Sequence, residues 1–324
     1  MKEYVSIIVP CYNVENCIER ALNSLCKQTY KEIEIICVND GSKDNTLKKL
    51  NAYQKQHLLN MRIITTENRG VSAARNAGLV AAKGKYIMFL DADDMYSNRT
   101  VELLVNALET ADADTAFSFW TVNKSKLQIG IFEYNKKKIK ATEIASHFMY
   151  RPSPVSFFSF IYKKSIIDEY GIYFDVDLKY GEDNLFFWKY LCHTKTGVYL
   201  DCPLYWYYQN PSSAMHNASW RNVDAVISGQ RAMEWMEKYN PELLAKYEKY
   251  SPARARFAIA KQFAAYGKKD LYHKFYKEYD VKRNMKNLLG KNGVKLSIAA
   301  FVAMHFPNMF YYVIRYFRSF GVRK

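Results

Sequence analysis

The chain has 324 residues, 49% of them hydrophobic and 24% charged, which is enough to bury one large core or a core with a sizeable appendage. Such a composition excludes a disordered chain. The net charge of +15 lies mostly at the C-terminal end, because residues 251–324 hold 16 Lys or Arg and 3 Asp or Glu. A surplus of this kind attracts anionic lipid headgroups or nucleic acid.

The six cysteines do not predict a metal site. None belongs to a C-x-x-C pair, and none shows the paired spacing with histidine that is typical of zinc ligands. Several fall in apolar runs, which favours reduced thiols in the core of a cytosolic protein. Residues 1–4 lead directly into the first apolar run, so the sequence predicts no signal peptide and a cytoplasmic location.

The first ninety residues alternate short apolar runs with stretches of helical periodicity. The predicted elements are strands at residues 5–10, 33–38, 62–65 and 86–90 and helices at residues 16–27, 44–56 and 72–82. Helices of this length between short strands predict a parallel α/β sheet joined by right-handed crossovers.

The second half of the chain is less regular. Strands are predicted at residues 156–163 and 198–207, with a helix at residues 183–192 between them. The run Lys136-Lys137-Lys138 is predicted to be a solvated loop. From about Ala225 the pattern is helical and basic, so we predict an α/β domain over residues 1–220 and a helical basic region over residues 221–324.

Polar segments follow the predicted strands at the points where the strands end. They are residues 10–13, 39–42 and 91–94, and residues 69–75 open the third helix. Ligands of open α/β sheets gather at the carboxyl ends of the strands. We therefore expect these segments to line one cleft.

Three carboxylates, those of Asp91, Asp93 and Asp94, follow the fourth predicted strand directly. Carboxylates at the mouth of a buried strand lose hydration and repel one another unless something neutralises them. Mg²⁺ or Mn²⁺, which prefer hard oxygen ligands, would do so. The alternative is that these residues cap the next helix, whose first turn favours negative charge. The D-x-D pattern alone does not decide between the two.

Five segments in order resemble the signatures of family-2 inverting nucleotide-sugar glycosyltransferases. They are SIIVPCYN at residues 6–13, NDGSKDNT at 39–46, NRGVSAARN at 68–76, D-x-D at 91–93 and GEDxxF at 181–186. The resemblance covers residues 5 to about 190. It implies a GT-A-type α/β fold, with a mostly parallel nucleotide-binding sheet flanked by helices and here a C-terminal helical basic extension.

On the donor side, the resemblance implies that the first segment, including Pro10, holds the nucleobase and that Tyr12 packs on a uracil ring. Asp40 matches the carboxylate that accepts a hydrogen bond from uracil N3, which implies UDP as the carrier. Arg75 matches the basic residue near the nucleotide, and a guanidinium suits phosphate recognition. The alternatives are a half-buried tyrosine, an Asp-Gly turn and a surface arginine.

For the reaction, the resemblance implies that Asp93 and Asp91 contact the Mn²⁺ or Mg²⁺ ion and the ribose. Asp183 matches the catalytic base, with Glu182 orienting the acceptor or the base. The alternative for both is an acidic helix start. His216 would be a third metal ligand or phosphate contact; the alternative is a surface histidine. One departure is Tyr208-Gln209-Asn210, where many relatives have an arginine.

Together these features predict metal-dependent, inverting transfer of a hexose or N-acetylhexosamine from a UDP-sugar to a growing surface polysaccharide or lipid-linked glycan. A nicotinamide dehydrogenase or nucleotidyltransferase is disfavoured because no glycine-rich loop follows the first strand. The alternative from another class is a non-enzymatic protein that binds polyanions or membranes through its basic tail. Nucleic acid is not the expected partner of the enzyme.

The tail carries the membrane prediction. Residues 296–314 contain no charged side chain, but His305, Pro307 and Asn308 make them a poor transmembrane span. We expect two short helices in the membrane interface, so that the protein is peripheral on the cytoplasmic face. The expected inserted side chains are Phe301, Phe306, Phe310, Tyr311 and Tyr312, and those facing anionic headgroups are Lys295, Arg315, Arg318, Arg323 and Lys324. The alternative is a tail that folds back onto the catalytic domain.

Overall fold

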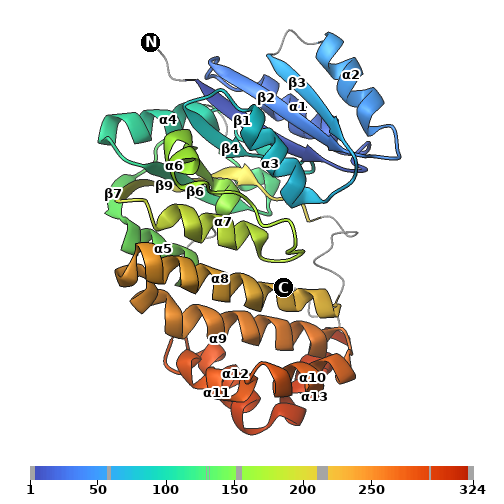
Figure 1. The fold of residues 1–324 in the computed structure, drawn as a ribbon, viewed down its shortest axis with the longest axis vertical. Coiled ribbons are helices and arrows are strands. Elements are labelled where there is room, and N and C mark those ends of the chain that lie inside the picture. Colours follow the sequence, from blue (N-terminus) through green and yellow to red (C-terminus); the bar gives the residue numbers. More distant parts are fainter. Residues whose placement is uncertain are drawn as a thin grey trace. The chain divides into compact units, whose positions relative to one another are not determined.

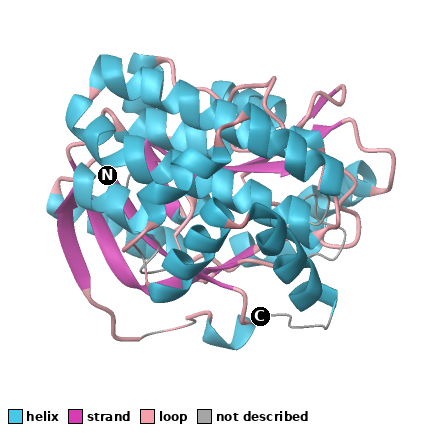
Figure 2. Cartoon of the chain, turned by 90° about the horizontal axis from the view of Figure 1, so that it is seen from below, coloured by secondary structure: helices cyan, strands magenta, loops and turns pink. Residues whose placement is uncertain are grey.

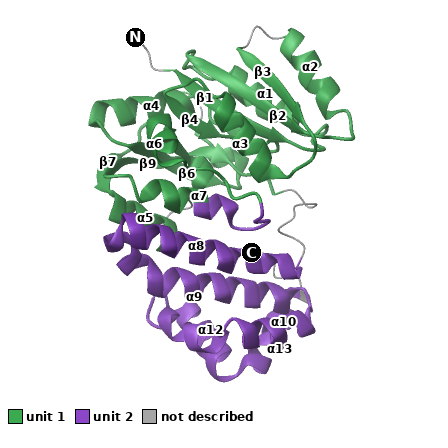
Figure 3. Cartoon of the chain, viewed as in Figure 1, with its two compact units in different colours: residues 1–176, 186–210 green, residues 177–185, 211–324 purple. Residues whose placement is uncertain are grey.

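The computed structural model describes residues 4–56, 60–128, 130, 132–150, 155–209, 218–291 and 293–319 (Figure 1). It divides into two compact units, each made of two stretches of chain (Figure 3). Unit 1 comprises residues 1–176 and 186–210, and unit 2 comprises residues 177–185 and 211–324. The domain boundary predicted at residue 220 stays a prediction.

Unit 1 is built on a sheet whose first half is parallel, as predicted. Its strands are β1 (Val5–Cys11), β2 (Ile33–Asp40), β3 (Met61–Thr66) and β4 (Tyr86–Phe89), and the helices between them are α1 (Ile18–Cys26), α2 (Thr46–Gln56) and α3 (Val71–Ala81). β1 lies between β2 and β4, with Val5 opposite Ile33 and Tyr86. Every residue of β1 and β2 is buried, which is why both sequences are almost continuously apolar.

The second half of the sheet is mixed. It adds β5 (Met95–Tyr96), β6 (Thr115–Thr121), β7 (Lys136–Lys140), β8 (Phe160–Lys163) and β9 (Thr196–Trp206). The strand order is β3-β2-β1-β4-β8-β6-β9-β5, with β7 paired to β9. β8 is antiparallel to β4 and β6, whereas β6 and β9 are parallel. The helices here are α4 (Thr100–Ala111), α5 (Ala141–Tyr150), α6 (Lys164–Tyr170) and α7 (Glu182–Leu191), with short 3-10 turns η1 (Lys124–Lys126) and η2 (Phe157–Ser159).

Two predictions for this half were wrong. The lysines at residues 136–138 belong to strand β7, which pairs antiparallel with β9, and not to a loop. Their side chains are exposed, and lysines are typical of sheet edges, where they discourage pairing with other chains. The strand predicted at residues 156–163 begins only at Phe160, because residues 157–159 form a 3-10 turn closed by a Ser156–Ser159 capping box.

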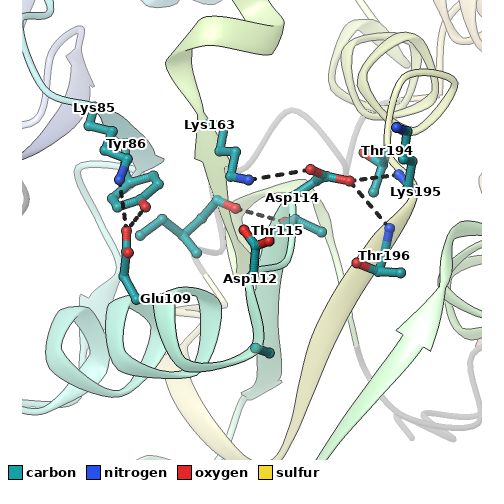
Figure 4. Close-up of polar contacts among 12 residues, drawn as sticks. Lys85, Tyr86, Glu109, Asp112, Asp114, Thr115, Lys163, Thr194, Lys195 and Thr196 are labelled. Carbon is teal, nitrogen blue, oxygen red and sulfur yellow. Dashed lines mark hydrogen bonds and ion pairs between the residues drawn. The ribbon is translucent and has the colours of Figure 1, made fainter.

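A polar cluster ties the strands together at the start of β6 (Figure 4). Asp114 accepts hydrogen bonds from the backbone N–H groups of Lys195 (2.7 Å) and Thr196 (3.3 Å) and forms an ion pair with Lys163 (3.4 Å). Thr115 donates to the carbonyl of Ile161 at 2.7 Å. Thr115 is buried and Asp114 and Lys163 are half-buried, and polar groups that are paired in this way help to fix which strands are neighbours.

Unit 2 is helical in its described residues, and Figure 2 distinguishes these helices from the strands by colour. Besides the first residues of α7, its elements are η4 (Trp220–Val223), α8 (Asp224–Tyr239), α9 (Pro241–Ala265), α10 (Lys269–Glu278), α11 (Val281–Met285), η5 (Lys286–Leu288), α12 (Val294–His305) and α13 (Pro307–Ser319). The long helix α9 contacts α8, α10, α11 and α13, so it forms the centre of this unit. Its buried side chains include Phe257 and Phe263.

The tail forms two helices separated at Pro307, as predicted, but two of its aromatic side chains were assigned wrongly. Phe310 and Tyr311 are each only 2% exposed. Phe310 packs on Phe257 of α9 with ring centroids 5.5 Å apart, and Tyr311 packs on Tyr272 of α10 at 5.1 Å. They therefore belong to the core of unit 2 and do not insert into a membrane. Arg323 and Lys324 lie outside the described residues.

Within the described ranges, none of the helices is both long enough and apolar enough to span a bilayer. All six cysteines are free thiols, as expected, and four of them are buried.

Candidate functional site

The loops after β1 and β2 are held together by reciprocal hydrogen bonds. Asn13 donates its backbone N–H to the hydroxyl of Ser42 at 3.1 Å, and its side-chain oxygen accepts from the backbone of Lys43 at 2.8 Å. Asn13 adopts a positive φ of 51°, a conformation that asparagine tolerates better than most residues. The nucleobase-binding segments expected from the sequence are thus neighbours at the carboxyl ends of two strands.

Pro10 and Tyr12 lie on either side of the end of β1. Pro10 is buried opposite Val38 of β2, and the pairing of β1 with β4 ends two residues earlier, at Ile8 and Phe89. Proline has no N–H with which to extend that ladder, so β4 and the loop that follows it can diverge from β1. Tyr12 is 45% exposed, so much of its side chain is accessible to a ligand.

Asp40 joins the second loop to the third. Its two carboxylate oxygens accept hydrogen bonds from the backbone N–H groups of Arg69 (2.9 Å) and Gly70 (2.8 Å), which lead into α3. The next residue, Gly41, has a φ of 66°, and a Cβ there would lie 2.7 Å from the backbone nitrogen of Asn68. Glycine is therefore required at this close approach. Asp40 is buried, and its Oδ1 also accepts a hydrogen bond from the hydroxyl of Thr66 at 3.4 Å, which leaves a lone pair available on Oδ2.

Arg75 of α3 and Asp91 form an ion pair with a nitrogen-to-oxygen distance of 2.9 Å. The guanidinium carbon of Arg75 also lies 4.7 Å from the ring centre of Phe157 and 5.3 Å from that of Phe174. The structure thus pairs two residues that were expected in one cleft but with separate roles. Arg75 is not a surface arginine, since its side chain is 5% exposed, and it neutralises part of the charge after β4.

Asp94 differs from the other two carboxylates of its loop. It is completely buried. It accepts a hydrogen bond from the hydroxyl of Tyr205 and another, at 2.8 Å, from the backbone N–H of Tyr208. Burial, together with the negative charges of Asp91 and Asp93, raises the pKa of Asp94 from 3.8 to about 9. Asp94 therefore anchors the loop to β9. The sequence shows a third carboxylate here but gives no sign of its partner 111 residues later.

Arg20 was not identified from the sequence. It extends from α1 and donates to the backbone carbonyl of Asp93 at 2.5 Å. Its guanidinium carbon lies 4.2 Å from the ring centre of Tyr208 and 5.0 Å from that of Trp206. Arg20 and Asp94 together fix the backbone of the D-x-D loop, and no local pattern around Arg20 predicts this role because its partners are distant in sequence.

The chemistry of the D-x-D loop fits a divalent cation. Asp91 and Asp93 are partly exposed, whereas Asp94 is buried and accepts a hydrogen bond from Tyr205 of β9. Mg²⁺ and Mn²⁺ typically bind one or two carboxylates and complete their shell with water and substrate phosphates. The described residues contain no group of three or more His, Cys, Asp or Glu side chains arranged to hold a metal. His216 and Asn210 lie outside the described residues, so their predicted roles stay predictions.

Glu182 and Asp183 lie in unit 2, in the first turn of α7. Asp183 accepts hydrogen bonds from the backbone N–H of Asn184 at 2.7 Å and from its side-chain amide at 3.1 Å. Glu182 is buried. Acidic side chains are favourable in the first turn of a helix, so the position of both carboxylates is compatible with a cap as well as with a base.

Helix α8 braces the segment that leads to Asp183. Asp224 accepts from the backbone N–H of Lys179 at 2.8 Å, Ser228 donates to the carbonyl of Gly181 at 2.6 Å, and Arg231 forms a bidentate ion pair with Asp177. Gly181 has a φ of 81°, and a Cβ there would lie 3.0 Å from the Cβ of Ser228. The first helix of the predicted basic region therefore supports the loop of the predicted base.

Comparison with known proteins places the chain in a described family. The sequence profile named "Glycosyl transferase family 2" matches residues 6–171. The uncharacterized glycosyltransferase EpsJ of Bacillus subtilis (strain 168) is 33% identical over 214 residues, which is 64% of this chain and 62% of EpsJ. The poly(ribitol-phosphate) beta-N-acetylglucosaminyltransferase TarS of Staphylococcus aureus (strain Mu50) is 30% identical over 243 residues, or 74% of this chain. The alignment covers 40% of TarS, so the chain matches less than two thirds of either relative.

Solved structures show the same fold. Residues 1–349 of S. aureus TarS, in complex with UDP-GlcNAc, superimpose with a TM-score of 0.71 at 22% identity, covering 98% of this chain and 92% of that one. A mannosyltransferase from Pyrobaculum calidifontis, in complex with GDP-Man and Mn²⁺, gives a TM-score of 0.52 at 17% identity, covering 95% of this chain and 88% of that one. These likenesses confirm the predicted GT-A fold.

Proposed function

The chain belongs to glycosyl transferase family 2, and we propose that it transfers a hexose or N-acetylhexosamine from a UDP-sugar to a glycan acceptor with inversion at the anomeric carbon. The observation that carries the proposal is that polar contacts join neighbouring segments at the carboxyl ends of β1, β2 and β4. Asn13 contacts the loop after β2, Asp40 contacts the backbone that leads into α3, and Arg75 of α3 pairs with Asp91. Ligands of α/β sheets bind at such an edge.

Each donor-side residue has a proposed role. The exposed ring of Tyr12 packs on the uracil, and Asp40 accepts the N3–H with the lone pair of Oδ2 that remains available beside the hydrogen bond from Gly70. Arg75 keeps Asp91 in place and presents positive charge near the diphosphate. N-acetylglucosamine is the first sugar to test, because TarS carries that sugar in its name and UDP-GlcNAc in its structure.

Asp93 and Asp91 are the proposed ligands of Mn²⁺ or Mg²⁺, with His216 as a further candidate, and the mannosyltransferase structure with Mn²⁺ supports a metal in this fold. When bound, the ion would neutralise the charge that develops on the UDP leaving group. Arg20 and Asp94 keep the backbone of this loop fixed, so its carboxylates need little reorganisation when the donor enters.

In the transfer step, Asp183 is the proposed base. It takes the proton of the acceptor hydroxyl while that oxygen bonds to the anomeric carbon, and the bond from this carbon to UDP breaks on the opposite face. UDP leaves with the bonding electron pair, and no covalent intermediate with the protein forms. Glu182 is proposed to orient Asp183 or the acceptor. A UDP-α-sugar should therefore give a β-linkage.

The proposed acceptor is a growing surface polysaccharide or a lipid-linked glycan. The names of TarS and of the beta-glucosyltransferase of Bacillus spizizenii, both enzymes of poly(ribitol-phosphate), support a surface glycan. A lipid-linked acceptor lies at the cytoplasmic face of the membrane, so the proposal includes peripheral contact with anionic lipid. A non-enzymatic role as a polyanion-binding protein is not supported by the family match.

A screen of UDP-sugars tests this function. The protein is incubated with Mn²⁺ and each UDP-sugar, and in parallel with GDP-sugars, first alone to detect hydrolysis and then with candidate acceptors. We expect one UDP-sugar to be consumed preferentially and the product to be β-linked by NMR. An α-linked product would mean a different mechanism, and consumption of GDP-sugars alone would refute the proposed role of Asp40 and Tyr12.

A further inference from the structure

We infer that the outward faces of α12 and α13 form a docking surface for anionic phospholipid bilayers. The inference gives a physical site to the proposed membrane contact. It rests on that part of the proposed function and is independent of the proposed chemistry.

Helix α13 carries a continuous apolar stripe on its outer side. Met309, Tyr312, Val313, Tyr316 and Phe317 are between 41% and 59% exposed. Their spacing of three and four residues places them on one face of the helix. Large apolar side chains are expected to be buried when a helix packs only within its own chain, so a whole exposed stripe indicates a partner.

The stripe continues across the break between the two helices. On α12, Ile298, Phe301 and His305 are exposed at the same helical spacing. The rings of Phe301 and His305 lie 4.5 Å apart, and His305 lies 6.3 Å from Phe306, which directly precedes α13. Phe306 is also exposed. The apolar surface therefore spans both helices.

The opposite faces of these helices are fixed to unit 2. Besides Phe310 and Tyr311 in the core, the hydroxyl of Tyr272 donates to the carbonyl of Pro307 at 2.7 Å, and that of Tyr276 donates to the carbonyl of Ala303 at 3.2 Å. Both tyrosines belong to α10, where they lie four residues apart on one face of the helix. These contacts fix which face of α12 and of α13 packs on unit 2. The stripe lies on the other face of each helix and is therefore exposed.

The charges around the stripe favour a bilayer. Residues 281–324 hold nine Lys or Arg and no Asp or Glu. Lys291 and Lys295 are exposed beside the start of α12. Arg318 does not border the stripe, because it lies seven residues after the buried Tyr311 and its guanidinium stacks on Tyr266 at 3.3 Å. Aromatic side chains with lysine and arginine at the margins are typical of helices that lie in the interface of anionic membranes. A nucleic-acid site would instead place the basic side chains at the centre of the surface.

Sedimentation with lipid vesicles tests the inference on the full chain. We expect the protein to sediment with vesicles of phosphatidylcholine and phosphatidylglycerol, and to do so less in high salt or with phosphatidylcholine alone. The triple variant Tyr312→Ser, Tyr316→Ser, Phe317→Ser should lower the bound fraction at a fixed lipid concentration by roughly tenfold or more, since binding scales with inserted apolar area. The control Val80→Ser, Tyr173→Ser changes exposed apolar residues of unit 1 and should bind normally.

A matched pair of charge variants separates local from overall charge. Lys291→Glu with Lys295→Glu and Lys246→Glu with Lys249→Glu change the net charge equally, and all four lysines are exposed. The first pair lies beside the stripe and the second on α9. We expect the first pair to weaken binding to anionic vesicles several-fold more than the second.

Three outcomes would overturn the inference. One is wild-type protein that stays in solution with anionic vesicles at physiological salt, and another is a triple variant that sediments as well as the wild type. The third is a wild-type dimer that the triple variant converts to a monomer without lipid, which would mean that a second copy covers the stripe. The increase in melting temperature caused by UDP is measured on every variant. If UDP does not raise the melting temperature of the wild type, the proposed chemistry is refuted. The vesicle experiment still decides whether the docking surface exists.

Discussion

Asp91, Asp93 and Asp94 are close in sequence and have three different surroundings. Asp91 pairs with Arg75, Asp93 is held through its backbone carbonyl by Arg20, and Asp94 is buried against β9. The repulsion expected among three carboxylates is thus reduced by one arginine and by the raised pKa of Asp94 before any metal is considered. Asp91 and Asp93, which are partly exposed, stay the proposed ligands of the cation.

Asp93→Ala should abolish most sugar transfer and the Mn²⁺-dependent part of UDP binding. The substitution removes one ligand and leaves the contact of Arg20 with the backbone carbonyl in place, so the fold should survive. Turnover and UDP affinity are measured with and without Mn²⁺, and Asp201→Ala, an exposed aspartate on β9, is the control. Unchanged turnover in the Asp93 variant would refute the assignment.

Asp94→Asn should make stability less dependent on pH. The folded-state pKa lies above the ordinary value of 3.8, so the folded protein keeps this proton at a pH where the unfolded chain releases it. The free energy of unfolding of the wild type therefore falls as the pH rises from about 4 towards about 9. Asparagine does not titrate and can still accept from Tyr208 and donate to Tyr205.

Urea unfolding between pH 5 and pH 9 checks this prediction. The stability of the Asp94→Asn variant relative to the wild type should increase with pH, whereas Asp201→Asn should follow the wild type. Parallel curves for Asp94→Asn and the wild type would show that Asp94 is ionised in the folded protein throughout this range.

Asp183→Asn tests the base. Asparagine keeps the shape of the side chain but cannot accept a proton, so donor binding should persist while kcat falls by on the order of 10² or more. Single-turnover kinetics and UDP titration separate the two effects. Normal turnover with weakened UDP binding would instead assign Asp183 to the donor side.

Among the elements, α8 has a role that its helical sequence does not suggest. Its residues Asp224, Ser228 and Arg231 contact the segment 177–181 that precedes Glu182 and Asp183. Ser228 and Gly181 are 47 residues apart, and such a distance leaves no periodic signal in the sequence. Only the fold brings them together.

Ser228→Ala should lower kcat with little change in the KM for the UDP-sugar. Loss of one hydrogen bond costs about 1 kcal/mol, which loosens the loop of the proposed base without touching the donor loops. Steady-state kinetics give the two constants, and Glu237→Ala, an exposed residue near the other end of α8, is the control. A rise in KM at constant kcat would contradict the proposed support of Asp183.

The same contrast between local and distant information explains which elements were predicted. β1, β2, β3 and β4 were found because each is a short apolar run followed by a helix or a polar loop. β7 was missed because three lysines at a sheet edge look like a loop until β9 pairs with them. In the tail, Tyr311 and Tyr312 have the same side chain, and only packing against α10 buries one and exposes the other.

For the whole molecule, the order of the five segments was enough to predict the family and the fold, both of which the comparisons confirm. The candidate site was predicted in part. The loops that follow parallel strands meet at one edge by necessity, so Asp40, Arg75 and Asp91 could be grouped from the sequence. Arg20 and the bond from Tyr205 to Asp94 could not, because they join segments 73 and 111 residues apart.

The central claim is that the edge formed by β1, β2 and β4 binds UDP together with a divalent cation. Thermal unfolding with UDP and Mn²⁺ tests it most directly, because a ligand at 100 times its Kd stabilises the folded state by about 2.7 kcal/mol. We predict that UDP raises the Tm of the wild type when Mn²⁺ is present, that GDP raises it much less, and that Asp93→Ala loses the Mn²⁺-dependent part. An unchanged Tm at millimolar UDP and Mn²⁺, or an equal increase with GDP, would contradict the account.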